Sequence, residues 1–300
     1  MSETSKTVTN ALKLLSCFSR EQSVFTASEL ARRLPLPRTS VIRLLASLEA
    51  FRLVERDRNG AGFRIGIRAF EIGTLFLAAN PLSSLLTDVL DRLVALTQCT
   101  AYLAVLDRDD VVILTYREGT LPIRFIWQVG DRLPCTTTAL GKAMLMHMSE
   151  VEIDQHVGTG KLRGLTAKSL RTREELNRDL ALARKRGWGL AREESHAGLT
   201  AVGSAILSEV NRPIAAISIS CLDYPPNPKR LAGFAAVVQQ VANEVSEKIR
   251  EYGSYGSSIS REALTYLPSG GLPLGDTGRA PSAFGAHDRR NLGDQRRQRV

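Results

Sequence analysis

Hydroxyl-bearing and cationic side chains recur along one side of the segment from Arg38 to Ala50. At 3.6 residues per helical turn, Thr39, Arg43 and Ala46 share this side, and an apolar stripe runs opposite it. Arginine, threonine and serine can hydrogen-bond to base edges, and a small alanine lets a partner approach closely. The pattern therefore predicts a surface that reads the major groove of DNA, formed by Arg38, Thr39, Ser40, Arg43 and Ser47. A packed corner between two core helices is the alternative interpretation.

Two short helices must position these side chains. Thr26 and Glu29 fit a capping box at the start of the first helix. Pro35 interrupts helical hydrogen bonding, and Pro37 suits the first position of the second helix. Residues 38–40 therefore fall in the opening turn of the second helix, which is the part that usually reaches bases.

A hairpin is predicted directly after the second helix. Strand-like runs at residues 53–56 and 63–65 flank a turn-rich segment, so the helices and the hairpin together make a winged helix-turn-helix. Three arginines of this wing can pair with phosphates or enter a minor groove: Arg56, Arg58 and Arg64. An ordinary solvated basic hairpin is the alternative. An amphipathic helix at residues 6–19 is expected to cover this winged helix-turn-helix, which we place at residues 1–66.

The overall composition is compatible with a nucleic-acid partner. The 300 residues carry a formal net charge of +9 and have a pI near 9.7, which favours an anionic partner, and their number suggests two domains. No apolar run is long enough to cross a bilayer, and the first residues lack the layout of a secretory signal. The four cysteines lack the spacing of a zinc site or a disulfide framework. We therefore expect a cytoplasmic protein with reduced thiols and no membrane association.

Motifs for enzymatic chemistry are incomplete. The segment Gly158–Lys161 resembles a phosphate loop, but Leu162 stands where a metal-binding hydroxyl belongs. Ser195 and His196 are adjacent, and neighbours in the chain rarely converge as nucleophile and base. The histidines show no i, i+4 pairing for a metal. The sequence therefore predicts no catalytic residue, no metal and no cofactor, with an enzyme built on the second domain as an alternative.

Beyond residue 66 the pattern predicts a linker helix and then an α+β domain. Residues 67–80 are apolar on several sides, which indicates a linker helix packed against its own domain and a partner subunit. Residues 81–252 combine runs of strands with helices, which favours an α+β domain over alternating βαβ units. Strands are expected at 101–106, 111–116, 123–129, 199–207 and 214–220, and helices at 82–96, 139–148, 152–157, 172–187 and 229–252. Residues 253–300 are expected to form a basic, largely disordered tail.

Two blocks of the second domain resemble the isocitrate-lyase-regulator (IclR) family of bacterial transcription factors. They are the TALGKAML run at Thr138–Leu145 and the segment Gly198–Ser220, and the likeness extends over residues 6–252. The resemblance implies an N-terminal winged helix-turn-helix, a linker helix and a C-terminal GAF-like effector-binding domain. It also implies a dimer or tetramer on a palindromic double-stranded DNA operator, controlled by a small effector such as an aromatic or short-chain carboxylate.

The same resemblance implies where the effector binds. The pocket is expected between the strand before Gly130, the start of the TALGKA helix and the last strands. Its implied residues are Phe125, Trp127, Ala139, Leu140, Ser218 and Ser220. The two serines alternate along a strand, so their hydroxyls face one common space. Hydroxyls and the backbone N–H groups of a helix start suit a carboxylate, and the two aromatic rings supply an apolar wall.

Two departures from the family pattern bear on the ligand. Where some members place an acidic residue and a cysteine in this pocket, the present chain has Ala191 and Ala201. These alanines suggest a less polar and larger ligand. Two alternatives stay open: the serines hydrogen-bond only to neighbouring backbone, or the domain senses a small molecule and acts through protein contacts.

Overall fold

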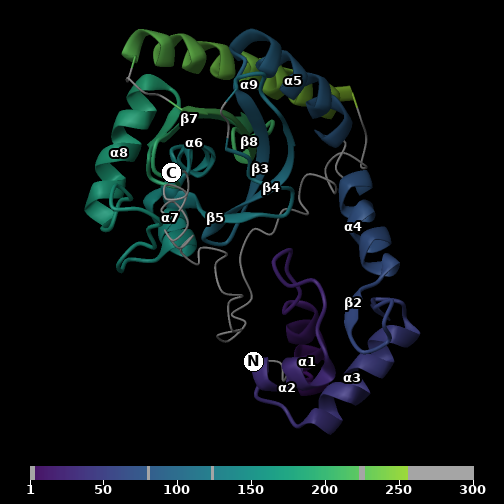
Figure 1. Cartoon of the computed structure of the whole chain (residues 1–300). Coiled ribbons are helices and arrows are strands. Elements are labelled where there is room, and N and C mark those ends of the chain that lie inside the picture. Colours follow the sequence, from purple (N-terminus) through teal and green to yellow (C-terminus); the bar gives the residue numbers. More distant parts are fainter. Residues whose placement is uncertain (1–3, 80–81, 123–124, 223–226, 256–300) are drawn as a thin grey trace, which may run out of the picture. The chain divides into compact units, whose positions relative to one another are not determined.

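The computed structural model describes residues 4–79, 82–122, 125–222 and 227–255. The chain divides into two compact units: unit 1 ends at Phe76 and unit 2 begins at Leu77 (Figure 1). Among the described residues, no helix is long and apolar enough to span a membrane.

Unit 1 is a winged helix-turn-helix, as the sequence predicts. Its helices are α1 (Lys6–Leu15), α2 (Ala27–Arg33) and α3 (Arg38–Ala50), and its wing is the antiparallel pair β1 (Val54–Arg56) and β2 (Phe63–Ile65). One buried apolar cluster joins these elements and includes Leu14, Phe25, Leu30, Val41, Leu45, Val54 and Phe63. α4 (Ile67–Ala79) follows directly after the wing.

Local hydrogen bonds determine where the helices of unit 1 begin and end. The Glu29 backbone N–H donates to Thr26 Oγ1 at 3.3 Å, and the Thr26 N–H donates to the Glu29 carboxylate at 2.7 Å, so the predicted capping box is confirmed. Pro37 was predicted at the first helical position of α3 but lies at its N-cap, because its backbone is not helical. The helix therefore begins at Arg38. α1 ends at Leu15, short of the predicted residue 19, where the Ser16 hydroxyl bonds back to Leu12 O.

Close backbone contacts hold the wing against the helices. Phe25 and Phe63 exchange backbone hydrogen bonds of 3.0 and 2.7 Å, which extends the wing by a short bridge. Gly66 lets the chain pass Arg52, whose carbonyl oxygen would lie 2.2 Å from an added Cβ. These contacts position the wing beside α3.

Unit 2 is built on a six-stranded sheet with the order β5-β4-β3-β8-β7-β6, in which each neighbouring pair is antiparallel. The strands are β3 (Thr100–Asp107), β4 (Asp110–Arg117), β5 (Arg132–Pro134), β6 (Gly189–Arg192), β7 (Leu199–Leu207) and β8 (Pro213–Leu222). The central pair, β3 and β8, is far apart in the chain and is therefore not a hairpin. The predicted α+β class is confirmed.

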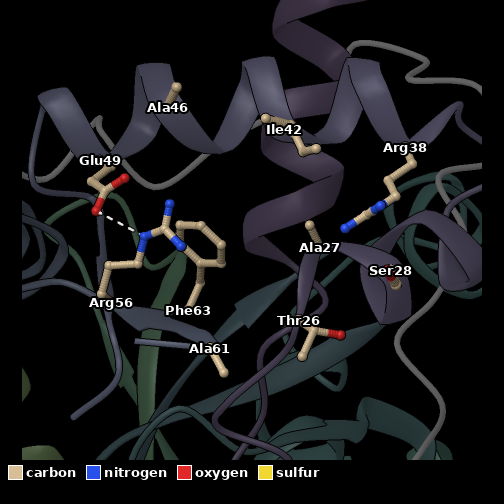
Figure 2. A pocket seen from close by; sticks show the side chains of 10 residues that line it. All are labelled: Thr26, Ala27, Ser28, Arg38, Ile42, Ala46, Glu49, Arg56, Ala61 and Phe63. Carbon is tan, nitrogen blue, oxygen red and sulfur yellow. Dashed lines mark hydrogen bonds and ion pairs between the residues drawn. The ribbon is translucent and has the colours of Figure 1, made fainter. Parts of the chain in front are cut away.

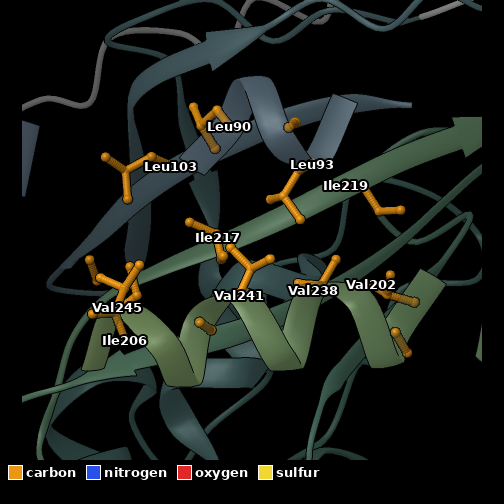
Figure 3. Close-up of a cluster of buried hydrophobic side chains, with 14 of the residues drawn as sticks. Leu90, Leu93, Leu103, Val202, Ile206, Ile217, Ile219, Val238, Val241 and Val245 are labelled. Carbon is orange, nitrogen blue, oxygen red and sulfur yellow. The ribbon is translucent and has the colours of Figure 1, made fainter. Parts of the chain in front are cut away.

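Helices cover both faces of this sheet (Figure 1). α5 (Leu82–Thr97) and α9 (Pro228–Tyr255) lie on one face, where Leu93, Ile217 and Val241 belong to one buried apolar cluster (Figure 3). The short η1 (Cys135–Thr137), α6 (Ala139–Leu145), α7 (Glu150–Val157) and α8 (Arg173–Arg186) contribute to a second cluster on the other face, together with Tyr102 of β3. Because side chains alternate along a strand, Ala215 and Ile217 of β8 belong to the first cluster and Ala216 between them belongs to the second.

The predicted strand at residues 123–129 is wrong. Residues 125–129 belong to no strand, and the edge strand is instead β5. The backbone groups of Phe125 and Trp127 bond to the Tyr102 hydroxyl rather than to a neighbouring strand. Gly130 then turns the chain with φ +86°. Residues 123 and 124 lie outside the described residues.

Other differences concern element ends and one short strand. β6 was not expected, because its four residues are too few to show a period. α6 ends at Leu145 rather than at residue 148. α9 continues to Tyr255, so residues 253–255 of the predicted tail are helical, and the rest of the tail lies outside the described residues.

The apolar side chains of α4 are more exposed than predicted. Phe70 and Leu75 are 67% and 65% exposed, and Ile72 is 49% exposed. Unit 1 therefore leaves these side chains largely uncovered, and the expected packing of α4 against a partner subunit stays a prediction.

Candidate nucleic-acid interface and ligand pocket

The side of α3 opposite the buried stripe is open to solvent. Thr39, Arg43 and Ser47 are exposed and Ser40 is half-buried, whereas Val41, Leu44, Leu45 and Leu48 are buried in the cluster of unit 1. Within the described part of the chain, the side chains of Thr39 and Arg43 make no hydrogen bond or ion pair. The Ser47 hydroxyl donates to Arg43 O at 3.1 Å and keeps its acceptor capacity. This side of α3 therefore presents available donors on a rigid helix.

The three wing arginines differ in how far they are already engaged. Arg56 lies 3.4 Å from the Glu49 carboxylate and stacks over the Phe63 ring at 4.2 Å (Figure 2). Arg64 pairs with Glu55 at 2.7 Å. The side chain of Arg58 is exposed and has no partner among the described residues. Arg58 is therefore the wing cation most readily available to a phosphate, and Arg56 also holds the wing to α3.

A hollow of about 440 Å³ lies between α3, the start of α2 and the wing (Figure 2). Its lining residues are Thr26, Ala27, Ser28, Arg38, Ile42, Ala46, Glu49, Arg56, Ala61 and Phe63. Arg38 extends from α3 toward the start of α2, and Ile42 and Ala46 line the α3 side. Sequence reasoning had identified Arg38 but had missed Ile42, because an isoleucine in a helix is ordinarily assigned to the core.

In unit 2, Ser218 and Ser220 lie at the centre of the sheet. Across the strands, Ser218 is paired with Tyr102 and Gly203, and Ser220 with Thr100 and Ala201. Both serines are buried, at 3% and 7% exposure. The Ser220 Oγ makes no hydrogen bond of ordinary geometry within the described residues, although the Tyr102 hydroxyl lies close enough for Ser220 to lower the Tyr102 pKa. A buried hydroxyl without such a bond is costly unless a ligand or water completes it.

The start of α6 lies directly over this part of the sheet. Thr138 caps the helix by accepting a hydrogen bond from the Gly141 N–H at 3.0 Å. Ala139 and Leu140 are buried. An added Cβ at Gly203, the strand partner of Ser218, would lie 2.9 Å from Ala139 O. The absence of a side chain at Gly203 therefore lets the helix start approach the strand that carries the two serines.

Aromatic side chains gather beside the Ser218 side of β8. Phe125 and Trp127 meet edge to face with ring centroids 4.6 Å apart, and the His196 ring lies 4.4 Å from that of Phe125. The Tyr102 hydroxyl donates to Phe125 O at 2.9 Å and accepts from the Trp127 N–H at 3.2 Å. Burial raises the pKa of Tyr102, and the Trp127 backbone and Ser220 act in the opposite direction. Tyr102 thus links the implied aromatic wall to the serine strand.

Sequence reasoning missed Tyr102 and His196. Tyr102 could have been found only from the pairing of β3 with β8, which places it directly across from Ser218. His196 reaches Phe125 from the loop between β6 and β7. Ala191 and Ala201 are strand partners, and Ala201 is in turn paired with Ser220. The two positions that depart from the family pattern therefore lie in line with Ser220 across the sheet.

A buried charge cluster supports the His196 loop. Lys142 of α6 is fully buried, and its Nζ lies 2.7 Å from both carboxylate oxygens of Glu194 and 2.9 Å from the Asp179 carboxylate. Burial raises the pKa of Glu194, and Lys142 opposes this rise. The Glu194 carbonyl oxygen also accepts a hydrogen bond from Ser169 Oγ at 2.6 Å. The cluster thereby joins α6 to the chain two residues before His196.

The cysteines and the metal-ligating side chains of the described residues can be assessed separately. The four cysteines are buried thiols outside any disulfide, and burial raises the pKa of Cys135, which makes it a poor nucleophile. In residues 4–79, 82–122, 125–222 and 227–255, no group of three or more His, Cys, Asp or Glu side chains could hold a metal.

Comparisons with known proteins agree with both units. Residues 7–58 match the family model described as the IclR helix-turn-helix domain, and residues 75–247 match that of the bacterial transcriptional regulator IclR C-terminal. The transcriptional repressor IclR of Escherichia coli (strain K12) is 30% identical over 243 residues, which are 80% of this chain and 89% of that protein.

Two solved structures share the fold at lower identity. An IclR transcriptional regulator from Alicyclobacillus acidocaldarius has a TM-score of 0.72 and 22% identity, over 82% of this chain and 100% of that chain. An IclR homologue from Microbacterium hydrocarbonoxydans, complexed with 4-hydroxybenzoate, has a TM-score of 0.71 and 22% identity, with the same coverage of 82% and 100%.

Proposed function

Because the chain belongs to the IclR family of bacterial transcriptional regulators, we propose that unit 1 binds a palindromic DNA operator and that a small carboxylate bound in unit 2 controls this binding. We assign residues 1–66 to DNA binding, 67–80 to the linker and 81–252 to effector binding. As part of this proposal, the protein regulates transcription in the cytoplasm and is not an enzyme.

The outward side of α3 supports the DNA-binding assignment. The side chains of Thr39 and Arg43 are exposed to solvent and have hydrogen-bonding groups available. The major groove of DNA is wide enough to admit one α-helix that carries such side chains. In unit 1, residues 4–76 contain twelve Lys or Arg against six Asp or Glu, which favours a polyanion. Arg38, Ser40 and Ser47 flank Thr39 and Arg43 on α3. Arg58 on the wing is available to contact a phosphate group of the DNA.

Replacing Arg43 with alanine is expected to weaken binding to the cognate operator by about 1–3 kcal/mol, because a bidentate contact to a base is lost. The measurement is a titration of cognate and random duplexes in fluorescence anisotropy at one fixed salt concentration. Arg178→Ala, an exposed arginine on α8, is the matched control for the change in net charge. Equal losses of affinity on both duplexes would make Arg43 a phosphate contact instead.

The effector assignment is supported chiefly by the buried Ser220 hydroxyl. It lacks a hydrogen bond of ordinary geometry and stands on the same strand face as Ser218, whose strand partner Gly203 closely approaches the start of α6. Phe125 and Trp127 offer an aromatic wall, and Ala191 and Ala201 place no carboxylate at the position where some family members carry an acidic residue. We therefore propose an aromatic carboxylic acid, for which the relative bound to 4-hydroxybenzoate is a precedent.

The double variant Ser218→Ala with Ser220→Ala is expected to abolish the effect of the acid on operator binding while leaving operator affinity unchanged. The acid would first be found by thermal shift against a panel of aromatic and short-chain acids that includes 4-hydroxybenzoate. Ser204→Ala is the control, since this buried serine of β7 is paired with Ile217 and so faces the other side of the sheet. An unchanged response of the double variant would show that the pocket lies elsewhere.

We further propose that the chain self-associates through α4 as a dimer or tetramer. The exposed Phe70, Ile72 and Leu75 are too apolar to remain in water, and a twofold dimer matches a palindromic operator. The effector then acts by shifting the equilibrium between arrangements of two DNA-binding units through α4.

A further inference from the structure

One apolar side chain stands out on the open part of α3. Ile42 is 47% exposed, although the apolar stripe of the same helix is buried. It belongs to a second row along α3, made by Arg38, Ile42, Ala46 and Glu49, all of which line the hollow that faces the wing (Figure 2). This row lies beside the outward row of Thr39 and Arg43, so one object lying on α3 would meet both rows.

The lining of the hollow restricts what that object can be. Arg38 and Arg56 provide cations at its rim, while Ile42, Ala46 and Ala61 provide small apolar patches. The Glu49 carboxylate lies 3.4 Å from Arg56, so the lining carries two cations and one anion and is net cationic. A partner that fits this lining must carry negative charge where it meets the arginines and an aliphatic group where it meets Ile42. The major-groove edge of DNA meets this description, because thymine presents a C5-methyl group among polar base atoms.

We propose that Ile42 is a specificity-determining residue that packs against the methyl group of a thymine in each operator half-site. This inference rests on the proposed DNA-binding function and adds the base that one side chain recognises. Ala46, one turn further along α3, is small enough for the base edge to approach. The ion pair between Glu49 and Arg56, with Arg56 stacked on Phe63, holds the opposite wall of the hollow in place before DNA arrives.

The experiment removes the methyl group from the DNA instead of relying on the protein variant alone. The full-length protein first selects its best duplex from a randomised library. Each thymine of that duplex is then replaced in turn by deoxyuridine, which lacks only the methyl group. Loss of one buried methyl contact corresponds to about fourfold weaker binding, from roughly 0.8 kcal/mol per buried carbon. We expect this loss at one thymine of each half-site and little change at the others.

The variant Ile42→Ala tests whether Ile42 is the side chain that contacts this methyl group. It is expected to bind the thymine duplex about fourfold less tightly than the unchanged protein, and to bind the thymine and deoxyuridine duplexes equally. Ile42→Val, which keeps most of the side chain, should retain part of the preference for thymine. Leu182→Ala, an exposed aliphatic residue of α8 in unit 2, is the control and should behave like the unchanged protein.

Two outcomes would overturn the assignment of Ile42. One is a selected site in which no deoxyuridine replacement weakens binding. The other is an equal penalty for deoxyuridine in the unchanged protein and in Ile42→Ala. Both leave the proposed function intact if the protein still prefers the selected duplex over random DNA, whereas the absence of any selected sequence would contradict the proposed function itself.

Discussion

Replacing Lys142 with methionine is expected to lower the free energy of unfolding of unit 2 by about 3–5 kcal/mol. Methionine has a similar length, so the packing volume is largely kept. The loss is electrostatic: the variant leaves the carboxylates of Glu194 and Asp179 without the ammonium group that lies 2.7 and 2.9 Å from them. An uncompensated buried charge is more costly than the net contribution of the pair. Both tryptophans, Trp127 and Trp188, belong to unit 2, so fluorescence during denaturation in urea reports its unfolding.

The neighbouring glutamate provides a matched control. Glu193 pairs with Lys168, whose side chain is 62% exposed, so Lys168→Met removes a lysine–glutamate pair at the surface and should leave the stability almost unchanged. Adding Glu194→Gln to Lys142→Met should restore part of the lost stability, because the buried charge is removed with its partner. If Lys142→Met and Lys168→Met lower the free energy of unfolding by the same amount, the buried charge cluster does not stabilise unit 2 in the way proposed.

The stability of Lys142→Met should also depend on pH. Burial already raises the pKa of Glu194 above its ordinary value of 4.5, and loss of Lys142 removes an opposing influence. An acid whose pKa is higher in the folded state binds its proton preferentially there, so lowering the pH stabilises that state. The penalty of the variant should therefore shrink as the pH falls toward 4.5. In the double variant with Glu194→Gln, this pH dependence should disappear.

Replacing Gly189 with alanine is expected to destabilise unit 2 by about 1–3 kcal/mol or more, the range for overpacked sites. An added Cβ would lie 2.4 Å from Ala139 O and 2.7 Å from Ala143 N, and both atoms belong to the backbone of α6. Neither can rotate away, so α6 must move off the sheet. Since the start of α6 borders the proposed pocket, the response of operator binding to the acid should weaken as well.

Gly233→Ala is the control for this prediction. Gly233 lies in α9, and an added Cβ would meet no heavy atom within 4 Å. Alanine in a helix interior is favoured over glycine by about 1 kcal/mol, so this variant should be as stable as the unchanged protein or slightly more stable. Chemical denaturation followed by circular dichroism compares the two. A stable Gly189→Ala protein with a normal response would show that α6 tolerates displacement.

Much of unit 1 could be derived from the sequence because its signals are local. The capping box of Thr26 and Glu29 involves residues three positions apart, and the exposure of Thr39 and Arg43 follows from the period of one helix. The same reasoning could not assign partners to the wing arginines. Whether Arg56 is available or stacked on Phe63 depends on how the hairpin packs against α3.

In unit 2, less of the detail could be derived from the sequence, because its contacts join distant segments. Periodicity identified most of its strands and helices, but it predicted a strand at 123–129 whose backbone is bonded by the Tyr102 hydroxyl. The alternation of Ser218 and Ser220 was visible, yet their neighbours Tyr102 and Gly203 come from other strands. Ile42 appeared as an ordinary apolar helix residue until the wing and α2 were seen to leave it open.

The sequence by itself determined the class of the chain, the two helices and the wing, and which side of α3 is polar, because helical and strand periods act over a few residues. Only the tertiary structure decided which side chains meet: Lys142 with Glu194, Tyr102 with Phe125, and Arg56 with Phe63. Such pairs depend on strand register and helix packing between distant segments, where a shift of one residue would turn a buried partner to the opposite face.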